Sequence, residues 1–179
     1  SGNGIGILNN GIFIDTAGCK INIQSLSGDL IQNSGLMNVD CIVDLSFAAE
    51  DGIHNTSTGV YRQNLGSMKL ASFGSDFIEN DNFFFADVMI DLPGGGSSGI
   101  ILNNKDSMIL GPNSKIIKSG NGTNRYVFNG TSGLLDNAGD WEFSNSGNTI
   151  IQNDGIILFR ATASLIGGHT GAHVITNTG

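Results

Sequence analysis

The sequence predicts a parallel β-helix, a coil in which three short strands per rung stack on the equivalent strands of the next rung. Three observations predict it over all 179 residues. A short aliphatic-x-asparagine pattern recurs about every 24 residues. Brief apolar clusters separated by turn residues lie between the recurrences, and the composition combines 27 glycines with only 2 prolines. We expect one all-β domain, residues 1–179, of about seven rungs with about 24 residues each.

The repeat consists of eight tripeptides with Ile or Val first and Asn third. Successive asparagines are 22 to 26 residues apart. The tripeptides begin at Ile7, Ile31, Ile53, Ile78, Ile101, Val127, Ile151 and Ile175, and they end at Asn9, Asn33, Asn55, Asn80, Asn103, Asn129, Asn153 and Asn177. A period near 24 also fits a leucine-rich repeat, but there the asparagine follows the last strand leucine by three positions rather than two.

The segments between the tripeptides have the character of strands. Clusters such as Ile12-Phe13-Ile14, Phe83-Phe84-Phe85 and Met108-Ile109-Leu110 are β-branched or aromatic and too short for helices. Glycine often follows the asparagine by two positions, as at Gly11, Gly35 and Gly155. We expect these glycines to supply positive φ at the corners of the coil.

Because the rungs stack, each column of equivalent residues in the repeat has its own structural role. Rungs about 4.8 Å apart place equivalent residues directly above one another. The Ile and Val column is expected to face the core, where each side chain contributes roughly 1.5 to 3 kcal/mol relative to exposure. The asparagines are expected to form one internal ladder of amide hydrogen bonds.

The asparagine-x-glycine corners and the aliphatic columns resemble the parallel β-helix repeats of bacterial surface proteins and adhesins, including domains of the filamentous haemagglutinin type. The resemblance covers essentially the whole chain, and it is one of repeat style. It implies a shared fold, because fold transfers between such proteins better than activity does. It also implies a secreted or cell-surface location and a structural role.

Charge limits the partners. Eight Lys and Arg against 16 Asp and Glu give a formal net charge of -8, which disfavours nucleic acid and anionic membranes. No apolar run approaches the roughly 18 residues of a membrane span. We expect neither nucleic-acid binding nor membrane insertion.

Few residues offer chemistry. Cys19 and Cys41 are one rung apart and form either a disulfide or two buried thiols. His169 and His173 have the spacing of a helical zinc pair, but on a strand four residues span about 13 Å, so surface histidines are the better interpretation. We expect no metal and no cofactor; calcium at acidic turns is conceivable, although the G-G-x-G-x-D signature is absent.

Parallel β-helices also include polysaccharide lyases and hydrolases, so a carbohydrate-active or carbohydrate-binding face is the alternative. Its candidate residues are Arg125, Asp140, Trp141 and Arg160. Polygalacturonase-like enzymes carry paired aspartates on consecutive rungs, and no Asp-Asp pair occurs here. The sequence therefore favours a structural protein without catalysis: a rigid stalk, an adhesin segment or a filament subunit, joined end to end with copies of itself or with neighbouring repeats, and with surface glycans as further candidate partners.

Overall fold

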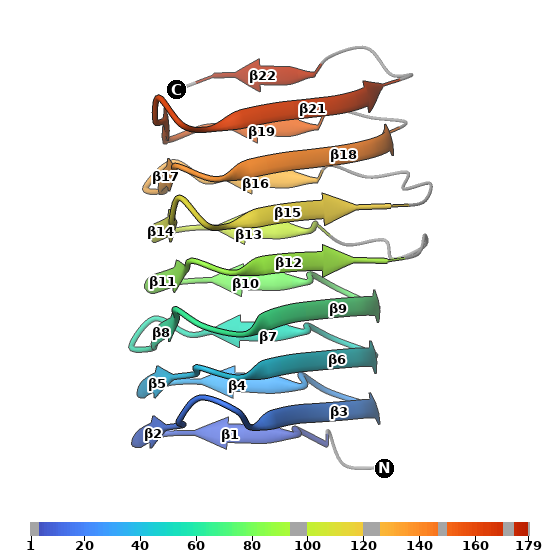
Figure 1. The fold of residues 1–179 in the computed structure, drawn as a ribbon, viewed down its shortest axis with the longest axis vertical. Helices are drawn as coiled ribbons and strands as arrows, with labels where there is room; N and C mark the ends of the chain where they lie inside the picture. Colours follow the sequence, from blue (N-terminus) through green and yellow to red (C-terminus); the bar gives the residue numbers. More distant parts are fainter. Residues whose placement is uncertain (1–3, 94–99, 120–125, 147–149, 170–173, 179) are drawn as a thin grey trace.

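The computed structural model describes residues 4–93, 100–119, 126–146, 150–169 and 174–178, and every element it contains is a β-strand. The chain winds into a parallel coil with three sheets, which we name A, B and C (Figure 1). Each rung contributes one strand to each sheet, in that order. The described strands of sheets B and C pair across six rung-to-rung steps, so the coil makes about six turns where about seven were predicted.

The strands of each sheet are short and in register with their neighbours. Sheet A contains β1 (Ile7–Asn9), β4 (Ile31–Asn33), β7 (Ile53–Asn55), β10 (Ile78–Asn80), β13 (Leu102–Asn104), β16 (Val127–Asn129), β19 (Ile151–Asn153) and β22 (Ile175–Asn177). Sheet B contains β2 (Ile12–Ile14), β5 (Leu36–Asn38), β8 (Val60–Gln63), β11 (Phe83–Ala86), β14 (Ser107–Leu110), β17 (Leu134–Asn137) and β20 (Ile156–Phe159). Sheet C contains β3 (Lys20–Leu26), β6 (Ile42–Ala48), β9 (Ser67–Phe73), β12 (Met89–Leu92), β15 (Lys115–Lys118), β18 (Asp140–Ser146) and β21 (Ser164–His169).

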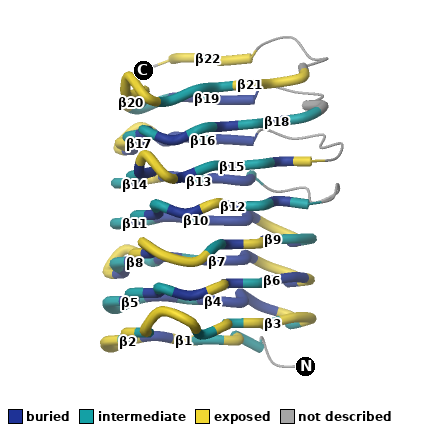
Figure 2. The backbone as a smooth tube through the Cα atoms, in the orientation of Figure 1, coloured by how far each residue is buried: buried dark blue, intermediate teal, exposed yellow. Residues whose placement is uncertain are grey.

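The core is a continuous column of apolar side chains inside the coil. Figure 2 shows buried residues along the strands of the middle rungs. The predicted aliphatic column is confirmed at Ile31, Ile53, Ile78, Val127 and Ile151, which are fully buried. Its two end members are more open because each has a rung on one side only within the described residues: Ile7 is half-buried and Ile175 is 49% exposed.

The asparagine ladder is also confirmed, as an unbroken chain of side-chain hydrogen bonds through the coil. Each Nδ2 donates to the Oδ1 of the asparagine one rung on, over 2.7 to 2.8 Å. The remaining donor capacity goes to turn carbonyls, as from Asn80 to Asn82 and Ser107. Because a primary amide has two N–H groups and a carbonyl oxygen, this arrangement satisfies a polar group that is fully buried in the middle rungs.

One rung of the predicted repeat was placed one residue too early. Ile78 pairs with Leu102, and Asn80 pairs with Asn104. The column and ladder members of this rung are therefore Leu102 and Asn104, not Ile101 and Asn103. With Asn104 in the ladder, β14 begins three residues later, as β11 does after Asn80, so the corner keeps its geometry. Ile101 is buried in the position before the strand, and Asn103 lies on the outer face of sheet A.

The prediction that the corner glycines supply positive φ is wrong. Among the described residues, positive φ occurs at Gly18 and Gly66 and at three non-glycine residues, not at Gly11, Gly35 or Gly155. Close stacking explains Gly35 and Gly155 instead: a Cβ on Gly35 would lie 2.0 Å from the carbonyl oxygen of Gly11, and one on Gly155 would lie 2.3 Å from that of Gly130. A side chain at either position would force adjacent rungs apart. A Cβ on Gly11, in the first rung, would have no neighbour within 4 Å.

The three non-glycine residues stack in sheet C. Ser25, Phe47 and Ser72 occupy equivalent positions in β3, β6 and β9, each with φ of 61° or 62°. Left-handed geometry costs an L-residue roughly 1–2 kcal/mol. Phe47 is also 59% exposed, so little packing compensates for this strain.

Replacing Phe47 with glycine should therefore relieve strain. We expect Phe47→Gly to be more stable than Phe47→Ala by about 1 kcal/mol, because both lose the ring and only alanine retains the Cβ. Urea unfolding of the two variants checks this. Equal midpoints would show that the left-handed column carries no strain.

The ladder yields a second prediction. Replacing Asn80 or Asn104 with leucine leaves buried amide and carbonyl groups without partners, and we expect a loss of about 1–3 kcal/mol. Thermal and urea unfolding measure it. Asn22→Leu on the exposed face of β3 is the control and should cost less. An Asn22 variant that is destabilised as much as the Asn104 variant would contradict the contribution of the ladder.

Candidate functional site

Charged side chains gather on the outer face of sheet A and at the corner that precedes it. We name this group the acidic cluster: Asp29, Asp51, His54, Asp76, Glu79, Asp81 and Lys105. The middle residue of each strand of sheet A points outward, and register stacks His54 of β7 on Glu79 of β10. His54 is the middle residue of the tripeptide Ile53-His54-Asn55.

The three corner aspartates form a second ladder, with the backbone as donor. Asp29 accepts the amide N–H of Asp51 at 3.1 Å, and Asp51 accepts that of Asp76 at 2.7 Å. Asp76 accepts the amide of Ile100 at 2.7 Å and the side chain of Asn103 at 2.6 Å. All three aspartates are buried. They therefore tie successive rungs together at the corner between sheets C and A.

His54 lies between carboxylates. Its Nδ1 is 3.4 Å from Asp29, and its Nε2 is 3.4 Å from Asp81 and 3.9 Å from Glu79. The hydrogen bond with Asp29 is the main cause that raises the pKa of His54 to about 9. An imidazolium is thus favoured at neutral pH, and Lys105 adds a second cation through ion pairs with Glu79 and Asp81.

Two carboxyl groups of the cluster hold protons more tightly than usual. Burial, followed by a hydrogen bond with Glu79, raises the pKa of Asp51 to about 7. Burial also raises the pKa of Asp76. Ligand atoms of Asp51, Asp76 and Glu79 lie within 4.8 Å of one another. These three carboxyl groups are close enough to share a proton. The acidic cluster as a whole has five carboxyl groups, which are balanced by the cations His54 and Lys105 and by backbone donors.

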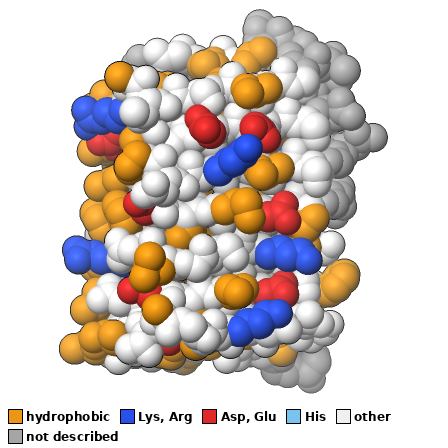
Figure 3. All heavy atoms as spheres, viewed as in Figure 1, with side chains coloured by type: hydrophobic (Ala, Val, Ile, Leu, Met, Phe, Trp, Pro, Cys, Tyr) orange, Lys and Arg blue, Asp and Glu red, His pale blue; other side chains and the backbone are white. Residues whose placement is uncertain are grey.

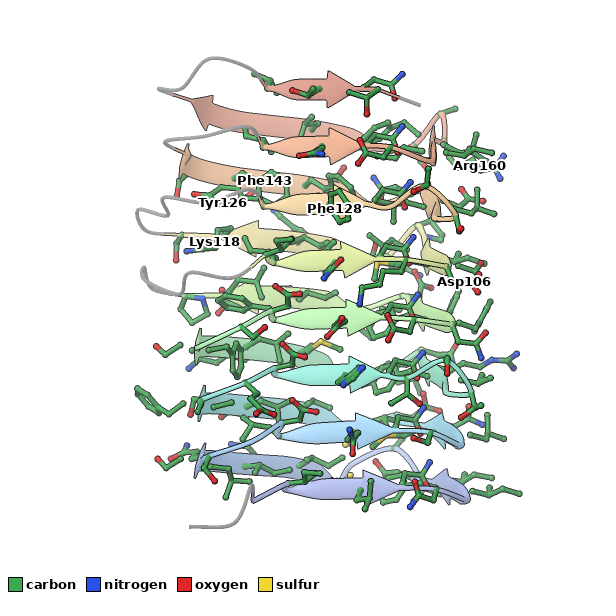
Figure 4. All side chains as sticks on the ribbon, turned by 180° about the vertical axis from the view of Figure 1, so that it is seen from behind. Asp106, Lys118, Tyr126, Phe128, Phe143 and Arg160 are labelled. Carbon is green, nitrogen blue, oxygen red and sulfur yellow. The ribbon has the colours of Figure 1, made fainter. Side chains whose placement is uncertain are left out.

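A shallow hollow on sheet C is the second candidate site. It has a volume of about 430 Å³ and is lined by Ile117, Lys118, Ser119, Glu142, Phe143, Ser144, Ile166 and Gly168. Lys118 is 4% exposed, and burial lowers its pKa. Its Nζ donates to the carbonyl of Ser119 at 2.7 Å. Figure 4 shows Lys118, Tyr126 and Phe143 near one edge of the coil, with Arg160 at the opposite edge.

Sequence reasoning missed Lys118, although a signal for it existed. Ile116 and Lys118 share one face of β15 by strand alternation, and register aligns them with Trp141 and Phe143 of β18. A lysine two residues after a core isoleucine therefore points toward the interior.

The predicted carbohydrate face is not assembled. Trp141 is fully buried and packs against Phe143 and Phe159, with ring centroids 5.8 and 5.4 Å away, so it is a core residue and cannot stack on a sugar. Asp140 accepts a hydrogen bond from Ser164. Arg160, which follows β20, forms an ion pair with Asp136 of β17. Arg125 lies outside the described residues.

The cysteines and the other histidines have separate outcomes. Cys19 and Cys41 are not bonded to each other, so the disulfide alternative is wrong in this structure. Cys41 is buried and Cys19 is half-buried. His173 lies outside the described residues, and only the backbone of His169 is described, at the end of β21.

The outer face of sheet B is largely apolar. One outward column contains Ile12, Leu36, Val60, Phe83, Leu134 and Ile156, with Ser107 as its polar member. The next column contains Ile14, Phe85, Ile109 and Leu158, interrupted by Asn38, Arg62 and Asp136. Ile12 is 75% and Ile156 59% exposed. Figure 3 shows hydrophobic side chains along the edge of the molecule where sheet B lies. Apolar residues thus occupy both faces of this sheet.

No family model, curated protein or solved structure matches the chain. Within the described ranges, the structure has no helix of the length and hydrophobicity that a membrane span requires. The conclusions on function therefore depend on the geometry of the coil itself.

The acidic cluster gives a pH prediction. His54 has a folded pKa of about 9, above the free value of about 6.5, so its stabilising contribution is complete below about pH 6.5 and is lost as the pH rises through about 9. Asp51, with a folded pKa of about 7 against a free value of about 3.9, makes folding less favourable as the pH rises from about 4 to about 7.

We expect the melting temperature of the wild type to fall between about pH 6.5 and 9, and His54→Gln to reduce that fall. Asp51→Asn should reduce the fall in melting temperature that accompanies a rise in pH from about 4 to about 7. Lys69→Gln on the exposed face of β9 is the control and should follow the wild type. A His54 variant whose melting curve runs parallel to the wild type across this range would contradict the assignment.

Proposed function

We propose that this chain is a structural protein of the cell surface or extracellular space that acts through its shape, as a rigid segment extended by stacking end to end on further rungs. The observation that carries the proposal is the asparagine ladder, which runs without a break from Asn9 to Asn177. A buried chain of hydrogen bonds along the axis resists bending, because every rung must keep its register.

The end rungs of the described coil support extension by stacking. Ile175 belongs to the core column yet is 49% exposed, and Phe159 in the last rung of sheet B is 43% exposed. At the first rung, the core side chains Phe13 and Ile21 are half-buried. Among the described strands, β1, β2 and β3 at one end and β22, β20 and β21 at the other are the edge strands of their sheets, and edge strands offer backbone groups for further pairing. A further rung, from another copy or from neighbouring repeats, would cover both.

The outer face of sheet B fits the same proposal. Large exposed apolar surfaces on a protein mark contacts with other molecules. This face offers a regular surface along the coil rather than a cleft. The charged groups of the acidic cluster are paired with one another and with backbone amides, so they support structure more than they favour catalysis.

End-to-end stacking can be tested with two matched substitutions. We expect the wild type to form fibres of uniform width with a repeat near 4.8 Å, seen by electron microscopy and fibre diffraction. Ile175→Lys places a charge in the stacking surface, and we expect it to raise the concentration needed for assembly at least about tenfold.

Met89→Lys is the control, because Met89 is 46% exposed but lies on the outer side of β12, the middle strand of sheet C. It should assemble like the wild type. Wild-type protein that stays as discrete short rods at every concentration, or an Ile175 variant that assembles normally, would contradict stacking of copies.

A further inference from the structure

Three side chains with metal-ligand chemistry converge at the corner between sheets B and C in the first two rungs. Asp15 follows β2, Cys19 precedes β3, and Cys41 precedes β6. The amide of Ile42 donates to the carbonyl of Cys19 at 3.3 Å, which places the two cysteines in neighbouring rungs. The thiol of Cys19 donates to Oδ2 of Asp15 at 2.6 Å.

The three ligand atoms have the spacing of a coordination site. The carboxylate oxygen of Asp15 and the two Sγ atoms all lie within 4.8 Å of one another. A tetrahedral zinc ion holds sulfur at about 2.3 Å and carboxylate oxygen at about 2.0–2.2 Å, which sets these atoms roughly 3.5–3.8 Å apart. Side-chain rotations that move each ligand atom by about 1 Å would bring the three atoms to these separations without moving the strands.

The backbone around the site is fixed by the third rung. Gln63 donates to the carbonyl of Cys41 at 2.9 Å. Gly66, with φ of 88°, packs so closely that a Cβ there would lie 2.0 Å from the same carbonyl oxygen. Cys41 itself is 2% exposed, whereas Cys19 is half-buried. One ligand is therefore held rigidly and another is accessible from solvent.

We propose that Asp15, Cys19 and Cys41 bind one thiophilic divalent cation of the Zn²⁺ class, with a fourth position left for solvent. Thiolates select zinc-like ions over calcium and magnesium. Binding releases two protons, one from each thiol, so the three anionic ligands and the ion leave a net charge of −1 at the site. The ion joins the first rung to the second.

The acidic cluster is the competing site, and it differs in its donors. Its aspartates already accept backbone amides, and its other carboxylates are paired with His54 and Lys105. Its hard carboxylate oxygens suit calcium or magnesium, and the imidazole of His54 suits zinc as well, but none of its ligands is a sulfur atom. A probe sensitive to sulfur ligands therefore separates the two sites.

The test uses Co²⁺ as a spectroscopic substitute for Zn²⁺, with protein kept reduced by a phosphine under argon. We expect one Co²⁺ per chain with a thiolate-to-cobalt charge-transfer absorption, displaced by Zn²⁺, and a higher melting temperature with Zn²⁺. Cys19→Ser should abolish the charge-transfer absorption or weaken binding at least tenfold, and Asp15→Asn should weaken it about tenfold. Glu79→Gln in the acidic cluster is the control and should bind like the wild type.

Absence of charge-transfer absorption in the reduced wild type would overturn the proposal. So would absorption of equal strength in Cys19→Ser, or binding lost in Glu79→Gln but retained in Cys19→Ser. Because Cys19 is half-buried, its serine variant should fold, and a melting curve taken without metal verifies this. Affinity should also fall as the pH is lowered, since burial raises the pKa of Cys41 and its proton must leave on binding.

Discussion

Vertical register is the constraint on which the rest of the structure depends. A β-strand alternates its faces, so a slip of one residue would turn an inward asparagine outward and bring a charged residue such as His54 or Glu79 into the core. The asparagine ladder penalises that slip, because each buried amide needs a partner directly above and below it. With the ladder in place, every other column follows: the aliphatic core, the aspartates at the next corner and the close glycine contacts.

The structure combines two kinds of polar ladder. The asparagines bond to one another inside the coil, and the aspartates accept backbone amides at the corner between sheets C and A. Neutral amides can stack without repulsion, whereas stacked carboxylates cannot. The carboxylates are therefore accompanied by the cations His54 and Lys105. The pKa of Asp51 is raised mainly by burial, followed by the hydrogen bond with Glu79.

The same repetition shapes what the protein offers to other molecules. A coil of stacked rungs presents continuous faces, and one of them, the outer face of sheet B, is largely apolar, with Arg62 and Asp136 as its charged members. The departures from repetition are local: a buried lysine at the hollow on sheet C, and the two thiols beside Asp15 at one end. We therefore expect the function of this coil to reside in its surfaces, in its ends and in these two irregular places.

The coil could be predicted from the repeat, because stacking requires the same kind of residue at the same interval. The ladder could be predicted in the same way, except in one rung. There, Ile101-Leu102-Asn103-Asn104 fits the pattern in two ways, and only the length of the following corner selects Asn104. Other contacts are visible only in the folded chain. Trp141 is a core residue rather than part of a carbohydrate face, the carboxylates near His54 come from three rungs, and the thiols of Cys19 and Cys41 lie together beside Asp15. Most of these contacts join different rungs, and their distances depend on side-chain packing that a repeat pattern does not encode.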